Sequence, residues 1–476
     1  MPLKTDQSVT PQTLVPQIER LFELSAGKIL GLEKSWNPDR GAPVFTARGR
    51  YTTRGWTEWT QGFQSGMALL QFDATGDPRF LELGRRGTHQ RMASHVSHIG
   101  VHDHGFNIIS TYGNLRRLLR EGKTPFNEHE LGVCELALKV SGAIQAARWT
   151  PVAGGGGFIY SFNGPHSLFI DTMRSLRSLG LGHQLGHVLM GERDRRISLL
   201  ERLVQHAQTT ARFSICYGEG RDRFDVRGRT AQEAIFNTND GTFRCPCTQQ
   251  GYSPYTTWTR GLAWGLSGFA EQLELVRILA DEEIDRALAG TAESGDDGVG
   301  AGGKASGFRA LLLRAALASA DYYLENCCAD GVPMWDTGAP NLHRLGTYGA
   351  QPADPFNEWE PVDSSAAAIA AQGLLRLGAY MSATNQTRLA SRYRHAGLTI
   401  ARTLLFDPYL SSNPKHQGIL LHSVYHRPNG WDYVAGGQKV PNGESSMWGD
   451  YHLLELGVLI WRLARNERYL AFFDRP

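Results

Sequence analysis

The stretch DSSAAAIAAQGLL, residues 363–375, is the clearest indication of the fold because it predicts a helix that packs closely against its neighbours. Its alanine-rich face lets other helices approach, and Asp363 or one of the serines after it suits the N-cap. A helix of this kind belongs on the inside of a helical assembly.

Further amphipathic segments with a helical period lie on both sides of this stretch, separated by loops rich in glycine and proline. They cover residues 12–33, 58–74, 78–97, 107–122, 127–148, 166–190, 195–215, 257–283, 307–327, 363–382, 386–406 and 446–466. Strand-like alternation is confined to short pieces such as 417–426. About twelve successive helices without a cluster of strands favour antiparallel helix pairs that close into an all-α (α/α)6 barrel.

The inner helices of such a barrel are apolar but carry aromatic and polar side chains toward a central cavity. The segments with this character hold Trp59, Asp171, Trp258, Arg260, Trp264 and Ser364. No linker divides the chain, so we expect a single domain over residues 1–476. The low-complexity run at 289–306 predicts a mobile surface loop.

Composition excludes several classes of function. The 476 residues are 41% hydrophobic and carry a net charge of +2, which favours a globular enzyme and no nucleic-acid or membrane partner. The N-terminus lacks the apolar core of a secretory signal, so we expect a cytoplasmic protein. The six cysteines match no zinc or disulfide pattern, Cys245-Pro-Cys247 included, and we expect reduced structural thiols.

Two aspartates suggest acid/base chemistry. Asp103 lies in HDHGF, residues 102–106, and Asp171 interrupts the apolar run of SLFIDTMRSL, residues 167–176. A carboxylate in an apolar segment is costly unless it is paired or reaches a cavity, and glycosidases use such groups as acids and bases. Structural alternatives remain open: a helix cap for Asp103, and a cap or a buried ion pair for Asp171.

The segment QQGYSPYTTWTRGLAW, residues 249–264, is typical of a sugar site. Trp258 stands where a helix begins, and Arg260 and Trp264 share one face of that helix. Indole rings stack on pyranose rings, and an arginine can bind a sugar carboxylate or orient a catalytic acid. Packing roles for the same side chains are equally compatible with the sequence.

The histidines raise the question of a metal site. His95, His98, His102 and His104 cluster in sequence, and His183 and His187 are four residues apart. No carboxylate or further histidine completes a ligand pattern, so we expect polar contacts in place of a metal, and no cofactor.

Taken in order, these motifs resemble those of the unsaturated glucuronyl hydrolases, glycoside hydrolase family 88. TEWTQGFQSGMALL (57–70), HDHGF, SLFIDTMRSL, QHAQTT (205–210), QGYSPYTTWTRGLAWGLSGF (250–269), DGVPMWD (330–336), DSSAAAIAAQGLL and WGDYHLLEL (448–456) follow one another along nearly the whole chain. The resemblance implies an (α/α)6 barrel. It also implies removal of a 4,5-unsaturated uronic acid from the non-reducing end of oligosaccharides released by polysaccharide lyases.

By the same resemblance, Asp171 is the acid and base, and Asp103 positions the substrate or tunes Asp171. The candidate substrate-binding residues are His102, Phe106, Trp149, His206, Gln250, Trp258, Arg260, Trp264 and Ser364. Three departures from the family pattern are MRSL after Asp171, an irregular 211–248 segment, and an insertion at 339–362 that ends in Glu358-Trp359-Glu360.

Three alternative functions remain open at this point. One is an unsaturated rhamnogalacturonyl hydrolase of family 105, with the same fold and hydration chemistry. Another is an inverting glycosidase with two carboxylates on opposite sides of the bond. The third is a carbohydrate-binding barrel without activity. The expected partner is an unsaturated oligosaccharide, and we expect the protein to be a monomer or a homodimer.

Overall fold

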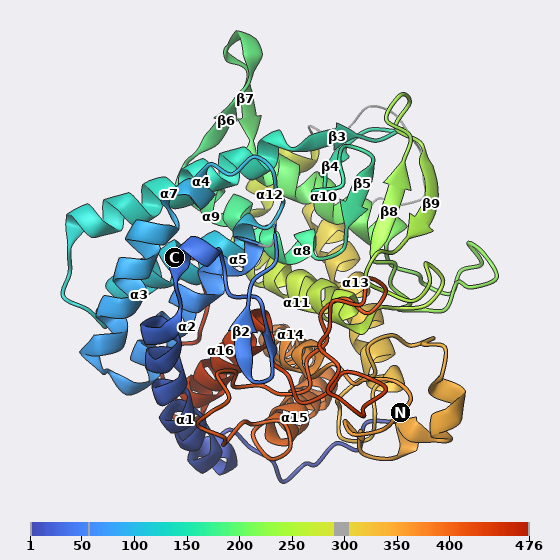
Figure 1. Cartoon of the computed structure of the whole chain (residues 1–476). Helices are drawn as coiled ribbons and strands as arrows, with labels where there is room; N and C mark the ends of the chain where they lie inside the picture. The colour runs from blue at the N-terminus through green and yellow to red at the C-terminus, as the bar shows by residue number, and fades with distance from the viewer. Residues whose placement is uncertain (1, 56–57, 290–303, 475–476) are drawn as a thin grey trace.

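The computed structural model describes residues 2–55, 58–289 and 304–474, and these residues are predominantly helical (Figure 1). The main helices are α1 (Val15–Ser35), α2 (Gln61–Thr75), α3 (Pro78–Arg91), α4 (Ala93–Val96), α5 (His104–Ile108), α6 (Asn114–Arg120), α7 (Glu128–Ala147), α8 (Thr172–Ser175), α9 (Arg177–Gln184), α10 (Leu199–Phe213), α11 (Thr259–Val276), α12 (Asp281–Ala289), α13 (Lys304–Asn326), α14 (Ser364–Ala383), α15 (Thr387–Leu404) and α16 (Met447–Ala464). A π-helical turn at Ile109–Gly113 joins α5 to α6.

Six helical hairpins form a closed ring, which is the predicted (α/α)6 barrel. The inner helices are α2, the α5–α6 run, α8 with α9, α11, α14 and α16. Each inner helix contacts the next, and α16 contacts α2 to close the ring. The outer helices α1, α3, α7, α10, α13 and α15 pair with them in chain order. The all-α fold predicted from the sequence is confirmed.

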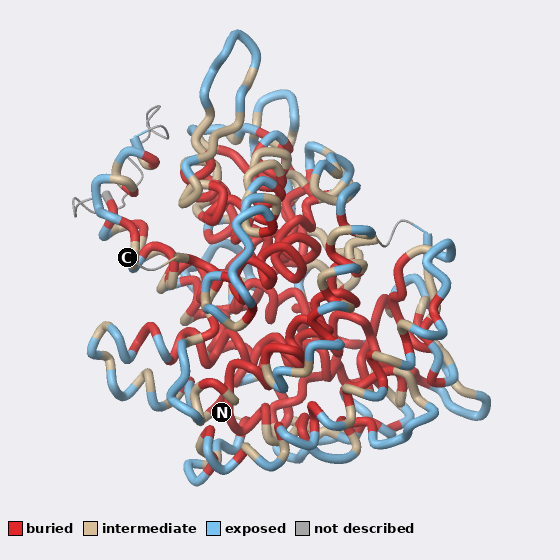
Figure 2. The backbone as a smooth tube through the Cα atoms, turned by 90° about the vertical axis from the view of Figure 1, so that its left-hand side faces the viewer, coloured by how far each residue is buried: buried red, intermediate tan, exposed pale blue. Residues whose placement is uncertain are grey.

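The inner helices are buried on all sides, as the alanine-rich 363–375 stretch predicted. In α14, every residue from Ser364 to Gly378 is buried, and Figure 2 shows the buried segments gathered in the middle of the molecule. Asp363 caps α14, since its carboxylate accepts hydrogen bonds from the backbone N–H groups of Ser365 and Ala366. The outer helix α15 instead has a charged, exposed face. Small inner residues therefore bring the six helices close together.

Short antiparallel strands decorate the barrel. They are β1 (Phe45–Ala47) with β2 (Arg50–Thr52), β3 (Trp149–Pro151) with β4 (Gly157–Ile159), β6 (Val188–Met190) with β7 (Arg196–Ser198), and a sheet in the order β5 (Ser167–Phe169), β8 (Glu233–Phe236), β9 (Phe243–Cys247). The hairpin of β6 and β7 projects from the top of the view in Figure 1.

Two of the sequence predictions for these regions were wrong. The helix expected over 166–190 begins as strand β5, continues as α8 and α9, and ends as strand β6. The backbone of β5 pairs with β8, so its apolar side chains belong to a sheet, which sequence periodicity did not distinguish from a buried helix. The piece at 417–426 makes only isolated bridges, such as Leu410 to Leu420.

Most of the loop expected at 289–306 lies outside the described residues, and helices α12 and α13 reach its two ends. All six cysteines are free thiols. Among the described residues, no helix is both long and apolar enough to cross a membrane.

Candidate active site

A cavity of about 370 Å³ lies at the end of the barrel where α5, α8 and α11 begin. Its wall combines aromatic rings with a few polar groups. The lining residues are Glu58, Trp59, His98, Gly100, Val101, His102, Asp103, Phe106, Phe162, Phe169, Asp171, Gln249, Gln250, Trp258, Arg260, Trp264, Tyr425, His426, Asn429 and Trp431. A mostly apolar hollow with a few convergent polar groups is typical of a small-molecule site.

Both aspartates singled out from the sequence lie in this wall, each at the start of a short helix. Asp103 precedes α5 and Asp171 precedes α8, yet neither side chain caps its helix. The two helix starts are held together by Gly105, where a Cβ atom would lie 2.2 Å from Cα of Ser175. Only glycine permits so close an approach, so the glycine of HDHGF brings Asp103 and Asp171 to one side of the cavity.

His102 lies between the two carboxyl groups. Its Nε2 atom is 3.2 Å from Oδ1 of Asp171 and 3.6 Å from Oδ1 of Asp103. The imidazole is only 1% exposed. Phe162 stacks on the ring and Phe169 meets it edge-on, with centroids 6.0 and 5.5 Å away. We refer to these three polar side chains, His102, Asp103 and Asp171, as the HDD cluster.

The electrostatics of the HDD cluster favour a protonated imidazole and a carboxyl group that keeps its proton. Burial opposes a charge on His102, but Asp103 and Asp171 outweigh it and raise the pKa of the imidazole. Burial also raises the pKa of Asp103 to about 6, with Asp171 reinforcing the shift and His102 and Arg148 opposing it. A carboxyl group that titrates near neutral pH is suited to proton transfer.

The 249–264 segment forms the wall next to α8, and hydrogen bonds to the backbone fix its loop. Oε1 of Gln232 accepts hydrogen bonds from the N–H groups of Gln249 and Gln250, at 2.7 and 2.8 Å. The carbonyl of Gln232 accepts from the N–H of Ile170, which connects this loop to the Asp171 strand. Asp336, at the end of the DGVPMWD motif, accepts from the N–H of Tyr252 at 2.8 Å.

Arg260 is more enclosed than the sequence suggested. Its guanidinium is bound to Asp363 at 2.9 Å, to Oε1 of Gln250 at 2.7 Å, and to the carbonyl groups of Val424 and Tyr425. It also lies 4.6 Å from the ring centre of Trp258. The residue reaches the cavity wall but is only 1% exposed, so its main contacts position the other wall residues.

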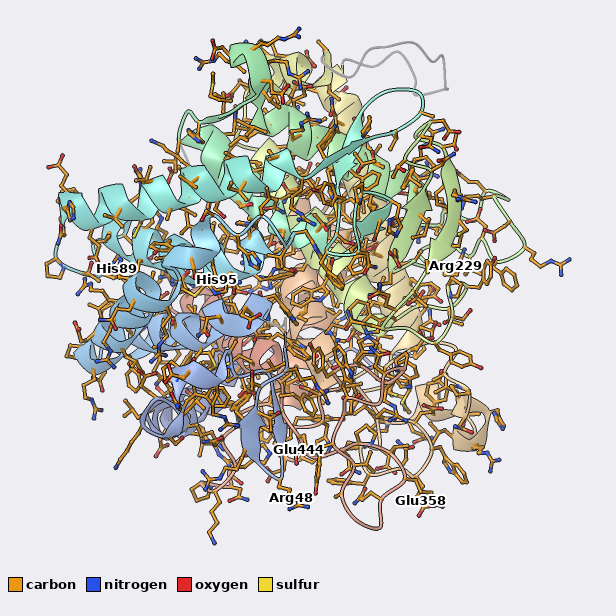
Figure 3. All side chains as sticks on the ribbon, turned by 45° about the horizontal axis from the view of Figure 1, so that its top comes forward. Arg48, His89, His95, Arg229, Glu358 and Glu444 are labelled. Carbon is orange, nitrogen blue, oxygen red and sulfur yellow. The ribbon has the colours of Figure 1, made fainter. Side chains whose placement is uncertain are left out.

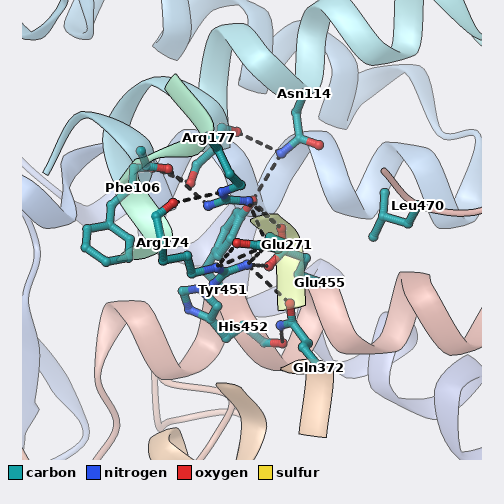
Figure 4. A network of polar contacts seen from close by, with 12 residues as sticks. Phe106, Asn114, Arg174, Arg177, Glu271, Gln372, Tyr451, His452, Glu455 and Leu470 are labelled. Atoms are coloured by element: carbon teal, nitrogen blue, oxygen red, sulfur yellow. Dashed lines mark hydrogen bonds and ion pairs between the residues drawn. The ribbon is translucent and has the colours of Figure 1, made fainter. Parts of the chain in front are cut away.

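A buried ion network that includes Arg174, Glu271 and Glu455 (Figure 4) lies next to Trp264. The indole packs against Phe106 at 4.8 Å and lies 5.7 Å from the guanidinium carbon of Arg174. Arg174 in turn binds Glu455 at 2.6 Å and Glu271 at 3.3 Å. Arg174 is the arginine of the MRSL departure, and the network accounts for its burial.

Three of the predicted substrate-binding residues do not line the cavity. His206 is fully buried, accepts a hydrogen bond from the N–H of Ile159 at 3.0 Å, and has its pKa lowered by burial to about 3. Ser364 is also fully buried and donates to the carbonyl of Leu421 at 2.6 Å. Trp149 has the guanidinium of Arg202 3.8 Å from its ring centre. These three side chains support neighbouring backbone or rings.

The sequence interpretation missed the wall contributed by the 425–431 loop. Tyr425, His426, Asn429 and Trp431 line the cavity, although they precede α16 by a long irregular segment. Asp432 fixes this loop by accepting from the N–H groups of Tyr425 and His426. The only signal for it in the sequence is a cluster of aromatic and polar residues in a stretch without helical period.

The remaining histidines make ordinary polar contacts. His95, labelled in Figure 3, is hydrogen-bonded to the side chain of Asn107, and His104 to Ser141 and the carbonyl of His98. His183 lies 3.3 Å from Glu283. Within residues 2–55, 58–289 and 304–474, no three His, Cys, Asp or Glu side chains form a group that could hold a metal ion.

Two segments depart from the family pattern, 211–248 and 339–362, and neither lines the cavity. Cys245 and Cys247 belong to β9, opposite Ile235 and Glu233. In the 339–362 insertion, Glu358 is exposed and bound by Lys439 at 2.7 Å (Figure 3). Glu360 is buried instead and accepts from the indole N–H of Trp335 at 2.8 Å.

The chain is similar to known proteins along most of its length. It is 25% identical over 430 residues to the unsaturated glucuronyl hydrolase of Bacillus sp. (strain GL1), covering 88% of this chain and 90% of the relative. It is 22% identical to the unsaturated chondroitin disaccharide hydrolase of Streptococcus agalactiae, covering 85% of this chain and 82% of the relative. No family model matches the chain.

Among solved structures, the fold is similar to that of an unsaturated glucuronyl hydrolase specific for heparin, with a TM-score of 0.67 and 18% identity over 95% of this chain and 98% of the other. The enzyme from Bacillus sp. GL1 gives a TM-score of 0.64 and 23% identity over 94% and 96% of the two chains. The likeness to unsaturated glucuronyl hydrolases thus spans nearly all of each chain, and the HDHGF and SLFIDTMRSL motifs, which carry the resemblance in the sequence, meet in one cavity.

Proposed function

We propose that this chain is a glycoside hydrolase that removes a 4,5-unsaturated uronic acid from the non-reducing end of lyase-derived oligosaccharides. The observation that carries the proposal is the HDD cluster, in which two carboxyl groups meet at one imidazole nitrogen inside an aromatic cavity. The similarity to unsaturated glucuronyl hydrolases over most of the chain supports it. We further propose that residues 1–476 act as a single catalytic domain.

The arrangement suits hydration of a vinyl ether. Asp171 gives its proton to C4 of the unsaturated ring, and positive charge develops at C5 beside the ring oxygen. The Asp171 carboxylate then accepts a proton from the water that adds to C5. The resulting hemiketal opens, and the hemiacetal left at C1 releases the leaving sugar with its glycosidic oxygen. One carboxyl group serves as acid and then as base, while Asp103 tunes it or positions the substrate.

The placement of the carboxyl groups favours this reaction over direct inversion at the anomeric carbon. An inverting glycosidase needs an acid and a base on opposite sides of the bond, with room for water between the base and the sugar. Here Asp103 and Asp171 share one wall and one imidazole partner. The adjoining wall of residues 249–264 presents Trp258 and the Gln250 amide, and the other carboxyl group in the cavity lining is that of Glu58.

The other wall residues suit a uronate ring. Trp258, Trp264 and Trp59 offer rings for stacking on a pyranose. Arg260 donates to Oε1 of Gln250, which leaves the amide nitrogen of Gln250 available as a donor. We assign this nitrogen to the carboxylate of the substrate, in place of the direct contact from Arg260 that the sequence suggested.

A panel of three substrates tests the proposal. Unsaturated glycosaminoglycan disaccharides should lose the absorbance of their conjugated double bond as the leaving sugar appears. Unsaturated rhamnogalacturonan products and a saturated uronide should react much more slowly. Preference for the rhamnogalacturonan products would assign a family 105-like activity, and turnover of the saturated uronide would contradict the hydration mechanism.

A further inference from the structure

The position of His102 calls for a role other than sugar binding. The imidazole is almost completely buried, and its Nε2 atom faces the carboxyl groups of Asp171 and Asp103. Its other ring nitrogen, Nδ1, is buried and has no hydrogen-bond partner among the residues that the structure describes. A buried imidazole that has one nitrogen close to two carboxyl groups interacts strongly with their charge, because the surrounding dielectric constant is low.

The backbone at His102 is fixed independently of the ring. The carbonyl of His102 accepts a hydrogen bond from Nε2 of Gln145 on α7, at 3.1 Å. Oε1 of Gln145 in turn accepts from the hydroxyl of Ser178 on α9. Because the ring is also held between Phe162 and Phe169, it cannot turn away from the carboxyl groups without disturbing several contacts.

We propose that His102 is a positioning residue that acts through Asp171: its imidazolium binds the Asp171 carboxyl group through Nε2 and stabilises the carboxylate that forms when Asp171 gives its proton to C4. This inference rests on the function proposed above. The imidazolium keeps its own proton throughout, so the reaction remains a transfer from Asp171 to C4 followed by a transfer from water to Asp171. Fixed groups aimed at developing charge in a buried site are a major source of rate acceleration.

All charged groups that face His102 are consistent with this role. Asp103 and Asp171 favour its protonated form. Arg148, held by the carbonyl groups of Tyr160 and Ser161, opposes that form more weakly. His206 on α10 also interacts with His102, but burial keeps it neutral, with a pKa of about 3. Among the described residues, two carboxyl groups therefore act on one imidazole, and Arg148 opposes them with a weaker effect.

Asp103 and His102 have opposite effects on the carboxylate that forms at Asp171. An anionic Asp103 repels that carboxylate, whereas the imidazolium attracts it. His102 thus prevents the pair of carboxyl groups from holding the proton too tightly for transfer to carbon. Loss of the imidazolium should therefore lower kcat and move the alkaline limb of the kcat profile to higher pH.

The variant His102→Gln tests the inference, because its amide can still donate a hydrogen bond but carries no charge. We expect kcat to fall about 100-fold, with less than a threefold change in KM. We also expect the alkaline limb of the kcat profile to move up by about one pH unit, because the carboxyl groups of the HDD cluster lose a neighbouring cation. A fall in kcat with an unmoved alkaline limb would overturn the inference.

The matched control is His104→Gln. His104 is equally buried and close in sequence, but it contacts Ser141 and the carbonyl of His98 instead of the carboxyl groups. Loss of these contacts should lower the melting temperature and leave the alkaline limb in place. A shift of the limb in His104→Gln equal to that in His102→Gln would show that the shift is a general effect of disturbing this region, and would overturn the inference.

A second measurement needs no substrate and does not depend on activity. Nitrogen NMR of labelled imidazoles should show that His102 in the wild type stays protonated above the ordinary pKa of histidine. In Asp171→Asn its titration midpoint should fall by about one unit. Titration of wild-type His102 at or below the ordinary value would overturn this inference while leaving the proposed function intact. Failure of the wild type to consume any unsaturated disaccharide would instead refute the proposed function.

Discussion

Nη2 of Arg260 donates to Oε1 of Gln250 across 2.7 Å, and this contact fixes which end of the amide faces the cavity. The same guanidinium binds Asp363 at the N-terminus of α14 and the carbonyl groups of Val424 and Tyr425, where the 425–431 loop begins. A single planar group thus joins three segments of the cavity wall. The amide nitrogen of Gln250 is left to donate to an anionic ligand.

Arg260→Lys should weaken substrate binding through Gln250. An ammonium group cannot bridge Asp363, Gln250 and the two carbonyl groups at once, so we expect KM for an unsaturated disaccharide to rise about tenfold. Gln250→Ala should raise KM by a similar factor with little loss of stability. Because both changes remove one interaction, the double variant should be no worse than Arg260→Lys. Full additivity in steady-state kinetics would contradict the link between the two side chains.

Asp171→Asn should abolish turnover and leave the fold intact. The amide cannot give a proton to carbon, so kcat should fall by at least about three orders of magnitude. Equal melting temperatures for variant and wild type provide the control. Retention of full activity would exclude Asp171 as the proton donor.

Asp103→Asn is the matched comparison for that variant, because the two carboxyl groups share His102. If Asp103 tunes the acid, kcat should fall strongly and its pH profile should change. A rise in KM alone would limit Asp103 to positioning the substrate.

The ion network under Trp264 should be sensitive to loss of one partner. Arg174→Met removes the cation that binds Glu455 at 2.6 Å and Glu271 at 3.3 Å. Arg177 remains at 4.0 and 3.4 Å from the same two carboxylates, so the change should cost about 3 kcal/mol of unfolding free energy. Adding Glu455→Gln should recover a large part of that loss, as measured by denaturant unfolding. As a surface control, Arg79→Ala, which removes the exposed pair with Asp77, should change stability by less than about 1 kcal/mol. A double variant with the same unfolding free energy as Arg174→Met alone would contradict this account.

Asp450, in the WGDYHLLEL helix, should give the stability curve a pH dependence. Burial raises its pKa from 3.8 to about 6, against hydrogen bonds from the N–H groups of Ile419 and Leu420 and the hydroxyl of Tyr51. A carboxyl group whose pKa is raised on folding favours the folded state most below its unfolded pKa, and that contribution is lost as pH rises through 6.

Between pH 4 and pH 7.5, the wild type should therefore lose up to about 3 kcal/mol relative to Asp450→Asn. Denaturant unfolding of both proteins across this range measures the difference. Parallel curves for the two proteins would contradict the assignment.

The sequence predicted the barrel well because helical period and small-residue faces are local properties. The DSSAAAIAAQGLL stretch is buried as expected, and Asp363 caps its helix. The segment around Asp171 was predicted less well, since an apolar run does not distinguish a strand paired with β8 from a buried helix.

Within the site, the sequence indicated which kinds of side chain reach the cavity more reliably than which residues those side chains contact. Asp103, Asp171, Trp258 and Trp264 all reach the cavity. The buried contacts of His206 and Ser364, and the folding of the 425–431 loop into the wall, depend on tertiary packing between distant segments. No local pattern in the sequence carries that information.

Proton NMR of a lyase-derived unsaturated disaccharide during turnover in D2O tests the hydration mechanism at the reacting carbon itself. Hydration predicts that the vinylic C4 signal disappears at the rate at which the leaving sugar is released. It also predicts that C4 of the product carries one solvent deuteron in a single configuration. Release of the leaving sugar while the vinylic signal persists on the free uronate would contradict the account.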